Sequence, residues 1–498
     1  MEEKAIRGIP WTLLAYATNR GLTLATMVVL ARLLAPDDFG VVAFGLLAGQ
    51  LMSYFFTLGL APTVVIRQDL HPEALGTALV LLAALTLVAA GLLAGLAPVA
   101  ADLLDQPGSS GVLAALAVPV ALGGVSSFYW AVMQRELQFS RLFVAHAAQV
   151  AAFAAVSILL AILEVGAWSL VGGQAAGVAT YATTLYVLAP YRVRPAFDPA
   201  SLRPLWRSSR GFMLQGGFSF LEQNADYLVV GSALGARQLG FYSMSYRITE
   251  LPYLGIVDPV CQATFPGYAR MRHRAEDVSG PLFTSLRLIS LCALPMGLVL
   301  SGAAEPFVNV VLGAKWEPAT GLLAILGVWG SVRVLQGTVG WFVNAMGFAS
   351  RLGVSYALLL VVSLPLLVVG ANKIGVKAVA WVMVGNMVVM LGIVFAIAHR
   401  QLGIPAGRLW HAVRASVIAS VPAWIVARVV SEVADGGPPA LVLAAALVAS
   451  VGTYFAVVTW AAPGLPREAA EQIARIISRR RAVPMPPLPA SDPAGETR

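Results

Sequence analysis

The chain contains little charge and very little cysteine or histidine. Only 12% of its 498 residues are charged, whereas 58% are hydrophobic. Because soluble domains carry about 25% charged residues, this composition excludes an ordinary soluble enzyme. The two cysteines, Cys261 and Cys292, lie in apolar surroundings without metal-ligand spacing, and the five histidines are scattered. We therefore predict no metal site, no disulfide and no histidine-based catalytic group.

The sequence also lacks the signatures of nucleotide-driven chemistry and of secretion. The motif GxxxxGK[ST] is absent, and no polar segment is long enough for an ATPase domain. The first residues, MEEKAIRGIP, lead into a long apolar stretch without an A-x-A-like cleavage site, so we expect no removable signal peptide. The net charge of +8 sits in short links beside apolar stretches, which argues against a nucleic-acid partner. We expect neither a cofactor nor catalytic residues.

Long hydrophobic runs dominate what is present. A bilayer core about 30 Å thick requires about 20 mostly apolar residues of helix. Stretches of this kind lie at 10–34, 40–66, 74–100, 111–133, 142–164, 166–190, 209–234, 240–268, 282–303, 318–346, 352–371, 375–398, 409–431 and 438–461. The sequence therefore predicts an all-α membrane protein with about 14 transmembrane helices.

The links between these stretches alternate in charge. Alternate links carry nearly all the arginines, and the others carry acidic residues such as Asp37, Asp38, Asp102 and Asp105. Lysine and arginine gather on the cytoplasmic side of membrane proteins. The alternation therefore predicts a single orientation with both termini in the cytoplasm. We expect the protein to be in contact with membrane lipids.

Two segments offset by 200 residues resemble each other and indicate an internal repeat. LLAPDDFG at 33–40 parallels ALGARQLG at 233–240, and both join two apolar stretches through a tight turn that ends in glycine. Chance similarity between apolar sequences is the alternative. Six stretches per copy predict a parallel repeat. The predicted division is an N-terminal six-helix lobe at 1–190, a cytoplasmic linker at 191–208, a C-terminal six-helix lobe at 209–400, two additional helices at 401–461, and a basic, proline-rich cytoplasmic tail at 462–498.

Ionisable residues occur within the predicted spans, where they are costly and usually line a water-filled path. They are Arg20, Glu222, Asp226, Arg247, Glu250, Asp258 and Arg333. Helical spacing places Gln215, Ser219, Glu222 and Asp226 on one face of a span, with Asn224 nearby. These groups predict a polar cavity between two lobes, and fixed internal ion pairs are the alternative interpretation.

Other spans contribute further polar groups and one expected distortion. Pro252 and Pro259 are expected to kink the span that carries Arg247 and Glu250. Arg32 and Arg287 lie nearer the ends of their spans, and we expect them to be snorkelling anchors.

Several stretches resemble bacterial polysaccharide transporters, the O-antigen and exopolysaccharide flippases. The opening LARLLAPDDFGVVAFGLLAGQLMSYFFTLGLAPTVVIRQDL carries this resemblance. MQRELQFSRL, DYLVVGSALGARQLGFYSMSYRITELP, FPGYARM and LGAKWEPA resemble the colanic and teichuronic acid exporter branch. The resemblance implies the multidrug/oligosaccharidyl-lipid/polysaccharide exporter superfamily, whose fold has two pseudo-symmetric six-helix bundles in a V around a central cavity. Members with fourteen spans carry two extra C-terminal helices.

The resemblance also implies a function and roles for the polar residues. Such proteins flip undecaprenyl-pyrophosphate-linked sugar repeats across the bacterial cytoplasmic membrane by alternating access, and cationic cavity residues are taken to meet the pyrophosphate or acidic sugars. By type and depth, the predicted substrate-binding residues here are Arg20, Asn19, Arg247, Arg333, Gln336 and Asn224. Buried carboxylates can exchange protons, so the predicted ion-coupling residues are Glu222, Asp226 and Glu250.

We expect the lipid-linked oligosaccharide to be the main partner, with a polysaccharide polymerase and a chain-length regulator as further partners. The alternatives are a peptidoglycan-precursor flippase or cation-coupled drug exporter on the same scaffold, a membrane-embedded polymerase or glycosyltransferase, and a non-transporting scaffold. Asp37 and Asp38 together would suit a metal-dependent glycosyltransferase, but the short outer links argue against it.

Overall fold

The computed structural model describes residues 21–464 except 57–59, 67–69, 137, 274–278 and 435, and all the regular structure in these ranges is helical. After a helix at Gly21–Leu33, the first bundle comprises α2 (Pro36–Phe56), α3 (Leu60–Ile66), α4 (Pro72–Leu103), η1 (Pro107–Ser109), α5 (Ser110–Ala115), α6 (Ala117–Arg135), α7 (Phe139–Ile162) and α8 (Trp168–Leu188). The second bundle comprises α9 (Pro199–Thr249), η2 (Tyr253–Val257), α10 (Asp258–His273), α11 (Ser279–Gly302), α12 (Ala304–Phe307), η3 (Val308–Leu312), η4 (Ala314–Ala319), α13 (Thr320–Ala345), α14 (Ala349–Lys373) and α15 (Val376–Leu402). The last two helices are α16 (Ala406–Val433) and α17 (Pro439–Ala461).

Nine of the helices in the described ranges are long and apolar enough to cross a membrane. The protein is therefore an all-α, multi-pass membrane protein, as predicted. The described parts of all fourteen predicted stretches fall on helices, but the helix Gly21–Leu33, α2 with α3, α8, α9 and α10 are not among the nine. Among these, α9 and α10 carry most of the intramembrane charges, which makes them more polar than the other spans.

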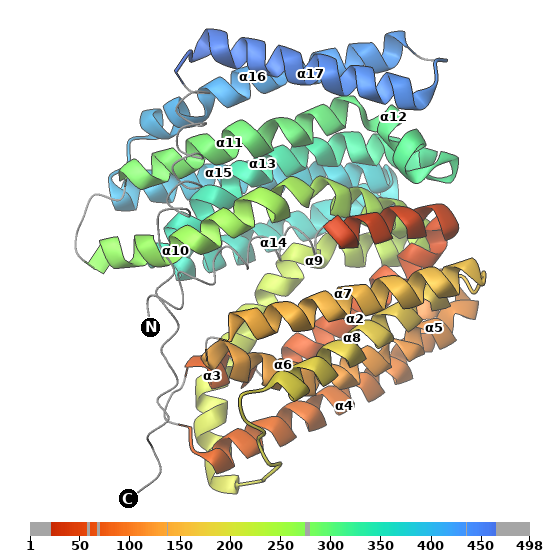
Figure 1. Ribbon diagram of the computed structural model, residues 1–498, viewed down its shortest axis with the longest axis vertical. Coiled ribbons are helices and arrows are strands. Elements are labelled where there is room, and N and C mark those ends of the chain that lie inside the picture. Colours follow the sequence, from red (N-terminus) through yellow and green to blue (C-terminus); the bar gives the residue numbers. More distant parts are fainter. Residues whose placement is uncertain are drawn as a thin grey trace, which may run out of the picture.

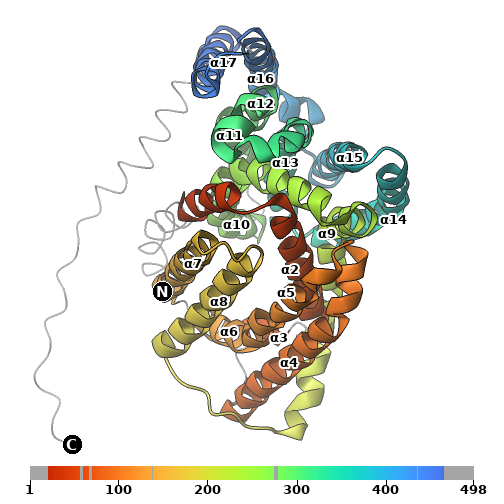
Figure 2. The same ribbon diagram turned by 90° about the vertical axis from the view of Figure 1, so that its right-hand side faces the viewer.

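The two bundles lie side by side, and α16 and α17 form an outer layer against the second bundle (Figures 1 and 2). In the first bundle α7 packs on α8 and α4 packs on α6. In the second, α11 packs on α13, and α13 packs on α15. α16 packs on both α11 and α17, which attaches the last two helices.

The buried side chains of the described residues form five clusters, and three of them show how the two bundles meet. At the end of the molecule where the acidic links lie, residues of both bundles, such as Leu104, Leu239 and Trp316, belong to one cluster. At the opposite end each bundle has its own cluster, one around Val132 and the other around Phe342. The bundles are thus packed together at the predicted outer end and packed separately at the predicted cytoplasmic end.

The long helix α9 joins the bundles and breaks at a glycine. Its N-cap is Asp198, whose side chain accepts a hydrogen bond from the backbone N–H of Ala200 at 3.0 Å. Leu205 packs in the core of the first bundle, whereas the end of α9 lies in the second. At Gly235 φ is 79°, a left-handed conformation that glycine adopts without steric penalty, and the chain turns there. A second irregularity, the π-helix η2, follows Pro252 and precedes Pro259, which confirms the predicted distortion.

The predicted repeat segments cross each other at their two final glycines. A Cβ atom on Gly40 would lie 1.8 Å from the carbonyl oxygen of Ala236, and a Cβ atom on Gly240 would lie 1.9 Å from that of Pro36. The two contacts are equivalent under an offset of 200 residues, because 36 corresponds to 236 and 40 to 240. Glycine at both positions allows the two backbones to approach this closely.

Side chains reinforce this junction at the same end of the molecule. Trp316 donates its indole N–H to the carbonyl oxygen of Ala31 at 2.8 Å, and Lys315 donates to that of Arg32 at 2.8 Å. Arg32 in turn donates to the carbonyl oxygens of Val310 and Val311. Arg32, expected to be a snorkelling anchor, thus also caps carbonyls at the end of the π-helix η3 of the second bundle.

Candidate functional site

A cavity of about 270 Å³ lies between α2 and α9, at the junction of the bundles. Its lining residues are Ala43, Leu46, Leu47, Gln50, Asn224, Tyr227, Tyr246, Arg247 and Glu250. Three lining positions on α2 have equivalents 200 residues later that also line the cavity: Leu46 with Tyr246, Leu47 with Arg247, and Gln50 with Glu250. The cavity therefore lies where the two repeat segments face each other, and we name it the axial cavity.

A second cavity, of about 280 Å³, lies inside the second bundle. Its lining combines aromatic and polar side chains from α9, η2, α13, α14 and α15: Glu222, Gln223, Tyr246, Tyr253, Trp329, Arg333, Gln336, Gly337, Gly340, Trp341, Asn344, Leu352, Tyr356, Met383 and Met387. We name it the bundle cavity. Tyr246 lines both cavities, so one side chain separates them.

An ion pair bridges the two cavities. Arg333 of the bundle cavity donates to a carboxylate oxygen of Glu250, which lines the axial cavity, at 2.8 Å. The guanidinium carbon of Arg333 lies 4.4 Å from the ring centre of Tyr253 and 5.1 Å from that of Trp329. Because only 18–19% of each side chain is exposed, removal of one partner would leave the other charge largely buried and is therefore costly. Arg333 is therefore held in place by a carboxylate and two aromatic faces.

Asp226 lies apart from the cavities, although its spacing from Glu222 predicted a shared face. Its side chain is fully buried and accepts a hydrogen bond from the hydroxyl of Tyr242. Tyr242 belongs to the part of α9 that follows the break at Gly235, and this part packs back against Asp226. The rings of Tyr227 and Tyr246 continue an edge-to-face cluster with Tyr242.

Several polar atoms around the bundle cavity have no hydrogen-bond partner within the described part of the chain. They are one carboxylate oxygen of Glu222, the indole N–H of Trp329 and the Nε–H of Arg333. Buried polar atoms are nearly always paired with protein or water. Three orphaned atoms on residues that line one cavity indicate a place for water or for a polar ligand.

The remaining polar lining groups are partly used and partly available. Gln336 donates to the hydroxyl of Tyr356 at 3.0 Å, and Trp341 donates to that of Tyr253 at 3.2 Å. Asn224 donates to the carbonyl of Phe220 within its own helix, which leaves its side-chain carbonyl oxygen as an acceptor. Arg247 is exposed in the axial cavity.

The structure thus brings six of the predicted site residues into two adjoining cavities. Arg247, Glu250 and Asn224 line the axial cavity, and Glu222, Arg333 and Gln336 line the bundle cavity. Asp226 is the buried exception, and Asn19 and Arg20 lie outside the described residues. Asp258, which was noted only as an intramembrane charge, accepts a hydrogen bond from Gln262 at 2.9 Å.

Gln50 of α2 and the aromatic side chains Tyr246, Tyr253 and Tyr356 were not predicted as site residues. The repeat could have revealed Gln50, because it is equivalent to Glu250 under the offset of 200. Asp38, considered for a metal-dependent transferase, accepts a hydrogen bond from the backbone N–H of Ala35 at 2.9 Å. Its carboxylate therefore serves the turn before α2.

The chain resembles known proteins over most of its length. Residues 29–321 match a family model described as "Polysaccharide biosynthesis protein". The chain is 29% identical over 325 residues to the succinoglycan biosynthesis transport protein ExoT of Rhizobium meliloti (strain 1021), which covers 64% of this chain and 65% of that protein. It is 23% identical over 346 residues to the lipopolysaccharide biosynthesis protein WzxC of Escherichia coli (strain K12), which covers 68% of this chain and 70% of that one. The match thus spans just under two thirds of the length of the first relative.

The fold resembles those of solved membrane transporters. The inward closed conformation of the lipid II flippase MurJ superposes with a TM-score of 0.74 at 10% identity, covering 92% of this chain and 99% of that one. An inward-facing multidrug resistance MATE family transporter of the MOP superfamily superposes with a TM-score of 0.60 at 14% identity, covering 78% and 98%. These likenesses show a shared fold, and the curated relatives agree with the expectation of a transporter rather than an enzyme.

Proposed function

Because the chain belongs to the family of polysaccharide biosynthesis proteins in the multidrug/oligosaccharidyl-lipid/polysaccharide exporter superfamily, we propose that it flips lipid-linked oligosaccharides. Its substrate is an undecaprenyl-pyrophosphate-linked repeat unit, which it carries across the bacterial cytoplasmic membrane for surface polysaccharide synthesis. The observation that carries this proposal is the axial cavity, because equivalent positions of two repeats line it and the second repeat supplies its charge.

The proposed mechanism is alternating access between the two bundles. The shared core and the glycine crossing close the end that bears the acidic links, whereas the opposite end has two separate cores. This distribution supports a V that opens toward the cytoplasm, with fourteen spans and both termini on that side. The proposed lobes at 1–190 and 209–400 move relative to each other, and the linker at 191–208 and the start of α9 connect them.

The proposed roles of the site residues follow from their surroundings. Arg247, exposed in the axial cavity, meets the pyrophosphate or an acidic sugar, because a guanidinium binds such oxygens in a bidentate manner. Arg333 is already paired with Glu250, so it reaches substrate only if that pair opens. Gln336 and Asn224 supply hydrogen bonds to sugar hydroxyls, and the aromatic faces of the bundle cavity, such as Trp341, suit the apolar faces of sugar rings.

Ion coupling is proposed for the carboxylates of the second bundle. Glu222 lines the bundle cavity with one unpartnered oxygen, counted within the described residues, and therefore has access to an entering cation. Glu250 couples through its bond to Arg333, because a proton on Glu250 weakens the ion pair. Asp226 acts through Tyr242 rather than by direct contact with the cavity.

The test is a strain that lacks this protein and any redundant carrier. Lipid-linked repeat units should accumulate on the cytoplasmic face, and wild-type protein should restore their appearance on the outer face. Arg247→Gln should restore it much more slowly than the wild type, while Arg428→Gln, which alters an exposed pair on α16, should restore it at the wild-type rate. Normal arrival of repeat units at the outer face without the protein would contradict the proposal, and arrest of cell-wall synthesis instead would indicate a peptidoglycan precursor as substrate.

A further inference from the structure

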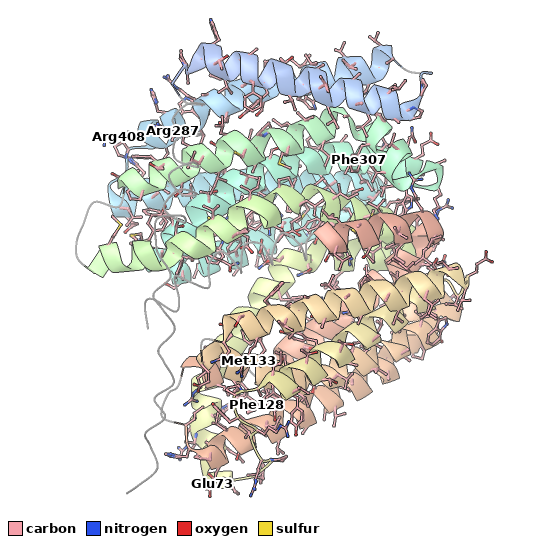
Figure 3. All side chains as sticks on the ribbon, in the orientation of Figure 1. Glu73, Phe128, Met133, Arg287, Phe307 and Arg408 are labelled. Carbon is pink, nitrogen blue, oxygen red and sulfur yellow. The ribbon has the colours of Figure 1, made fainter. Side chains whose placement is uncertain are left out.

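A cavity of about 510 Å³ lies between α11, α16 and α17, away from the axial and bundle cavities. It shares no lining residue with either of them. Arg287 of α11, His411 and Arg414 of α16, and Trp460 of α17 supply its polar and aromatic lining. Figure 3 shows Arg287 and Arg408 at the same end of the molecule, opposite to Phe307. We name this cavity the basic pocket, and its volume falls within the range of small-ligand sites.

The charged side chains among the described residues that line the basic pocket have one sign. Arg287 and Arg414 come from different helices that pack together, and among the described residues that line the pocket there is no carboxylate. Two guanidinium groups that converge on one space attract an anion into it. Guanidinium groups bind phosphate with paired hydrogen bonds, so a phosphate group suits this arrangement.

The depth of the pocket matches the membrane interface. Arg287 and Arg414 each lie eight residues after the start of their helix, about 12 Å along the axis at 1.5 Å per residue. Trp460 lies in the last turn of α17, and 83% of its side chain is exposed. Tryptophan at a helix end is typical of the lipid headgroup level. The positive-inside rule assigns this end to the cytoplasm, where anionic lipids are attracted to basic clusters.

The helices around the pocket are fixed to one another below it. The hydroxyls of Ser290 and Ser416 lie 3.3 Å apart, which links α11 to α16. The hydroxyl of Tyr454 donates to the carbonyl of Leu291 at 2.8 Å, which links α17 to α11. Apolar residues of α16, including Ile418, line the pocket beside the charges. The pocket thus combines a charged mouth with an apolar wall on a fixed frame, as a phospholipid requires.

We propose that the basic pocket binds the phosphate headgroup of an anionic phospholipid from the cytoplasmic leaflet. The headgroup lies between Arg287 and Arg414 beside Trp460, and the first carbons of the acyl chains lie along α16. The bound lipid attaches α16 and α17 to the second bundle and is separate from the transported substrate. This role does not depend on which oligosaccharide the axial cavity carries.

Native mass spectrometry of the purified, delipidated full-length protein tests this proposal. Phosphatidylglycerol should bind more tightly than phosphatidylcholine with the same acyl chains. Arg287→Gln and Arg414→Gln should each weaken phosphatidylglycerol binding about tenfold, the equivalent of 1.4 kcal/mol, because each removes one charged partner of the phosphate. Arg414 is exposed, so its replacement should leave the fold intact.

Arg408→Gln is the matched control, because Arg408 lies on the same helix and at the same end but does not line the pocket. It should change phosphatidylglycerol binding less than twofold. Equal losses for Arg408→Gln and Arg414→Gln would contradict the proposal, since they would indicate general attraction to a basic surface. Equal binding of the two lipids would also contradict it. Displacement of phosphatidylglycerol by millimolar inorganic phosphate would overturn the assignment to a lipid in favour of a free anion.

Discussion

The two repeat segments are alike in backbone and different in chemistry. In both, the chain turns just before a helical segment that contains a glycine, and the two glycines make equivalent contacts with the opposite segment. At the axial cavity, however, Leu47 of the first segment faces the same space as Arg247 of the second, and Gln50 the same space as Glu250. The first segment thus supplies neutral side chains where the second supplies charges.

The crossing and the axial cavity therefore place different requirements on the sequence. The crossing needs glycine in both copies, because a Cβ atom on either glycine would overlap a carbonyl oxygen of the opposite segment. The cavity needs its charges only once, because a residue on either segment reaches the same space. Asymmetry at the equivalent positions therefore suits an asymmetric substrate with one charged end.

The largest expected effect comes from replacing the glycines at which the two segments cross. Gly40→Ala and Gly240→Ala each place a carbon less than 2 Å from a backbone carbonyl oxygen. We expect each to destabilise the protein by about 3 kcal/mol or more, at the upper end for overpacked sites. The measurement is the thermal unfolding midpoint of the purified protein. Gly91→Ala is the control, because nothing lies within 4 Å of a Cβ atom there, and an equally stable Gly40→Ala would contradict the crossing.

The next effect comes from the ion pair between Arg333 and Glu250 in the second bundle. Glu250→Gln leaves Arg333 without its carboxylate and should cost about 2 kcal/mol, less than for a fully buried pair because about a fifth of each side chain is exposed. Arg333→Gln should cost a similar amount, and the double variant should cost less than the sum. Thermal unfolding of the four proteins in a double-mutant cycle measures the coupling. Strict additivity would show that the pair contributes no interaction.

Moving the arginine from position 247 of the second segment to position 47 of the first tests whether the two positions are equivalent. Arg247→Leu should reduce transport of the lipid-linked oligosaccharide about tenfold to a hundredfold, because it removes a charge-assisted hydrogen bond. Adding Leu47→Arg should restore part of that activity, since position 47 faces the same cavity. The readout is the rate at which repeat units reach the outer leaflet. Leu47→Arg alone is the control, and no recovery in the double variant would contradict the equivalence of the two positions.

A smaller effect is expected where side chains link the bundles beside the crossing. Trp316→Phe keeps an aromatic ring but removes the hydrogen bond to the carbonyl of Ala31. We expect a loss of about 1 kcal/mol, typical of one hydrogen bond, in thermal unfolding. Trp424→Phe is the control, since its indole N–H bonds a serine hydroxyl at a greater distance, 3.3 Å, in the outer layer. Equal losses in both variants would show that the link at Trp316 has no special contribution.

The fold could be predicted from local features of the sequence. The length of an apolar run, or a proline or glycine, determines the conformation of the residues next to it. The helices, the distortion near Pro252 and the turn before Gly240 could all be derived from these signals. The type of residue in the site could also be derived, since charges within apolar runs are conspicuous. The internal repeat also identifies a site residue that was not predicted, because its offset of 200 residues relates Gln50 to Glu250.

Partners distant in sequence could not be predicted. Arg333 and Glu250 are separated by 83 residues, and Arg32 bonds to carbonyls 278 and 279 residues away. Helical periodicity placed Glu222 and Asp226 on one face, but the break at Gly235 folds Tyr242 against Asp226 and buries it. Predictions from side-chain spacing assume a straight helix. The contacts of Asp226 depend instead on the break at Gly235, where α9 turns.

The central claim, that the axial cavity is the path of the substrate, is tested most directly at Gln50, which is exposed there. In a variant with Cys261 and Cys292 replaced by alanine, Gln50→Cys is treated in inverted membrane vesicles with a water-soluble thiol reagent. Val354→Cys is the control, because 60% of its side chain is exposed on the outer surface of α14. We predict rapid labelling at position 50, which lipid-linked oligosaccharide slows, and little labelling at position 354. No labelling at position 50, or labelling that the substrate leaves unchanged, would contradict it.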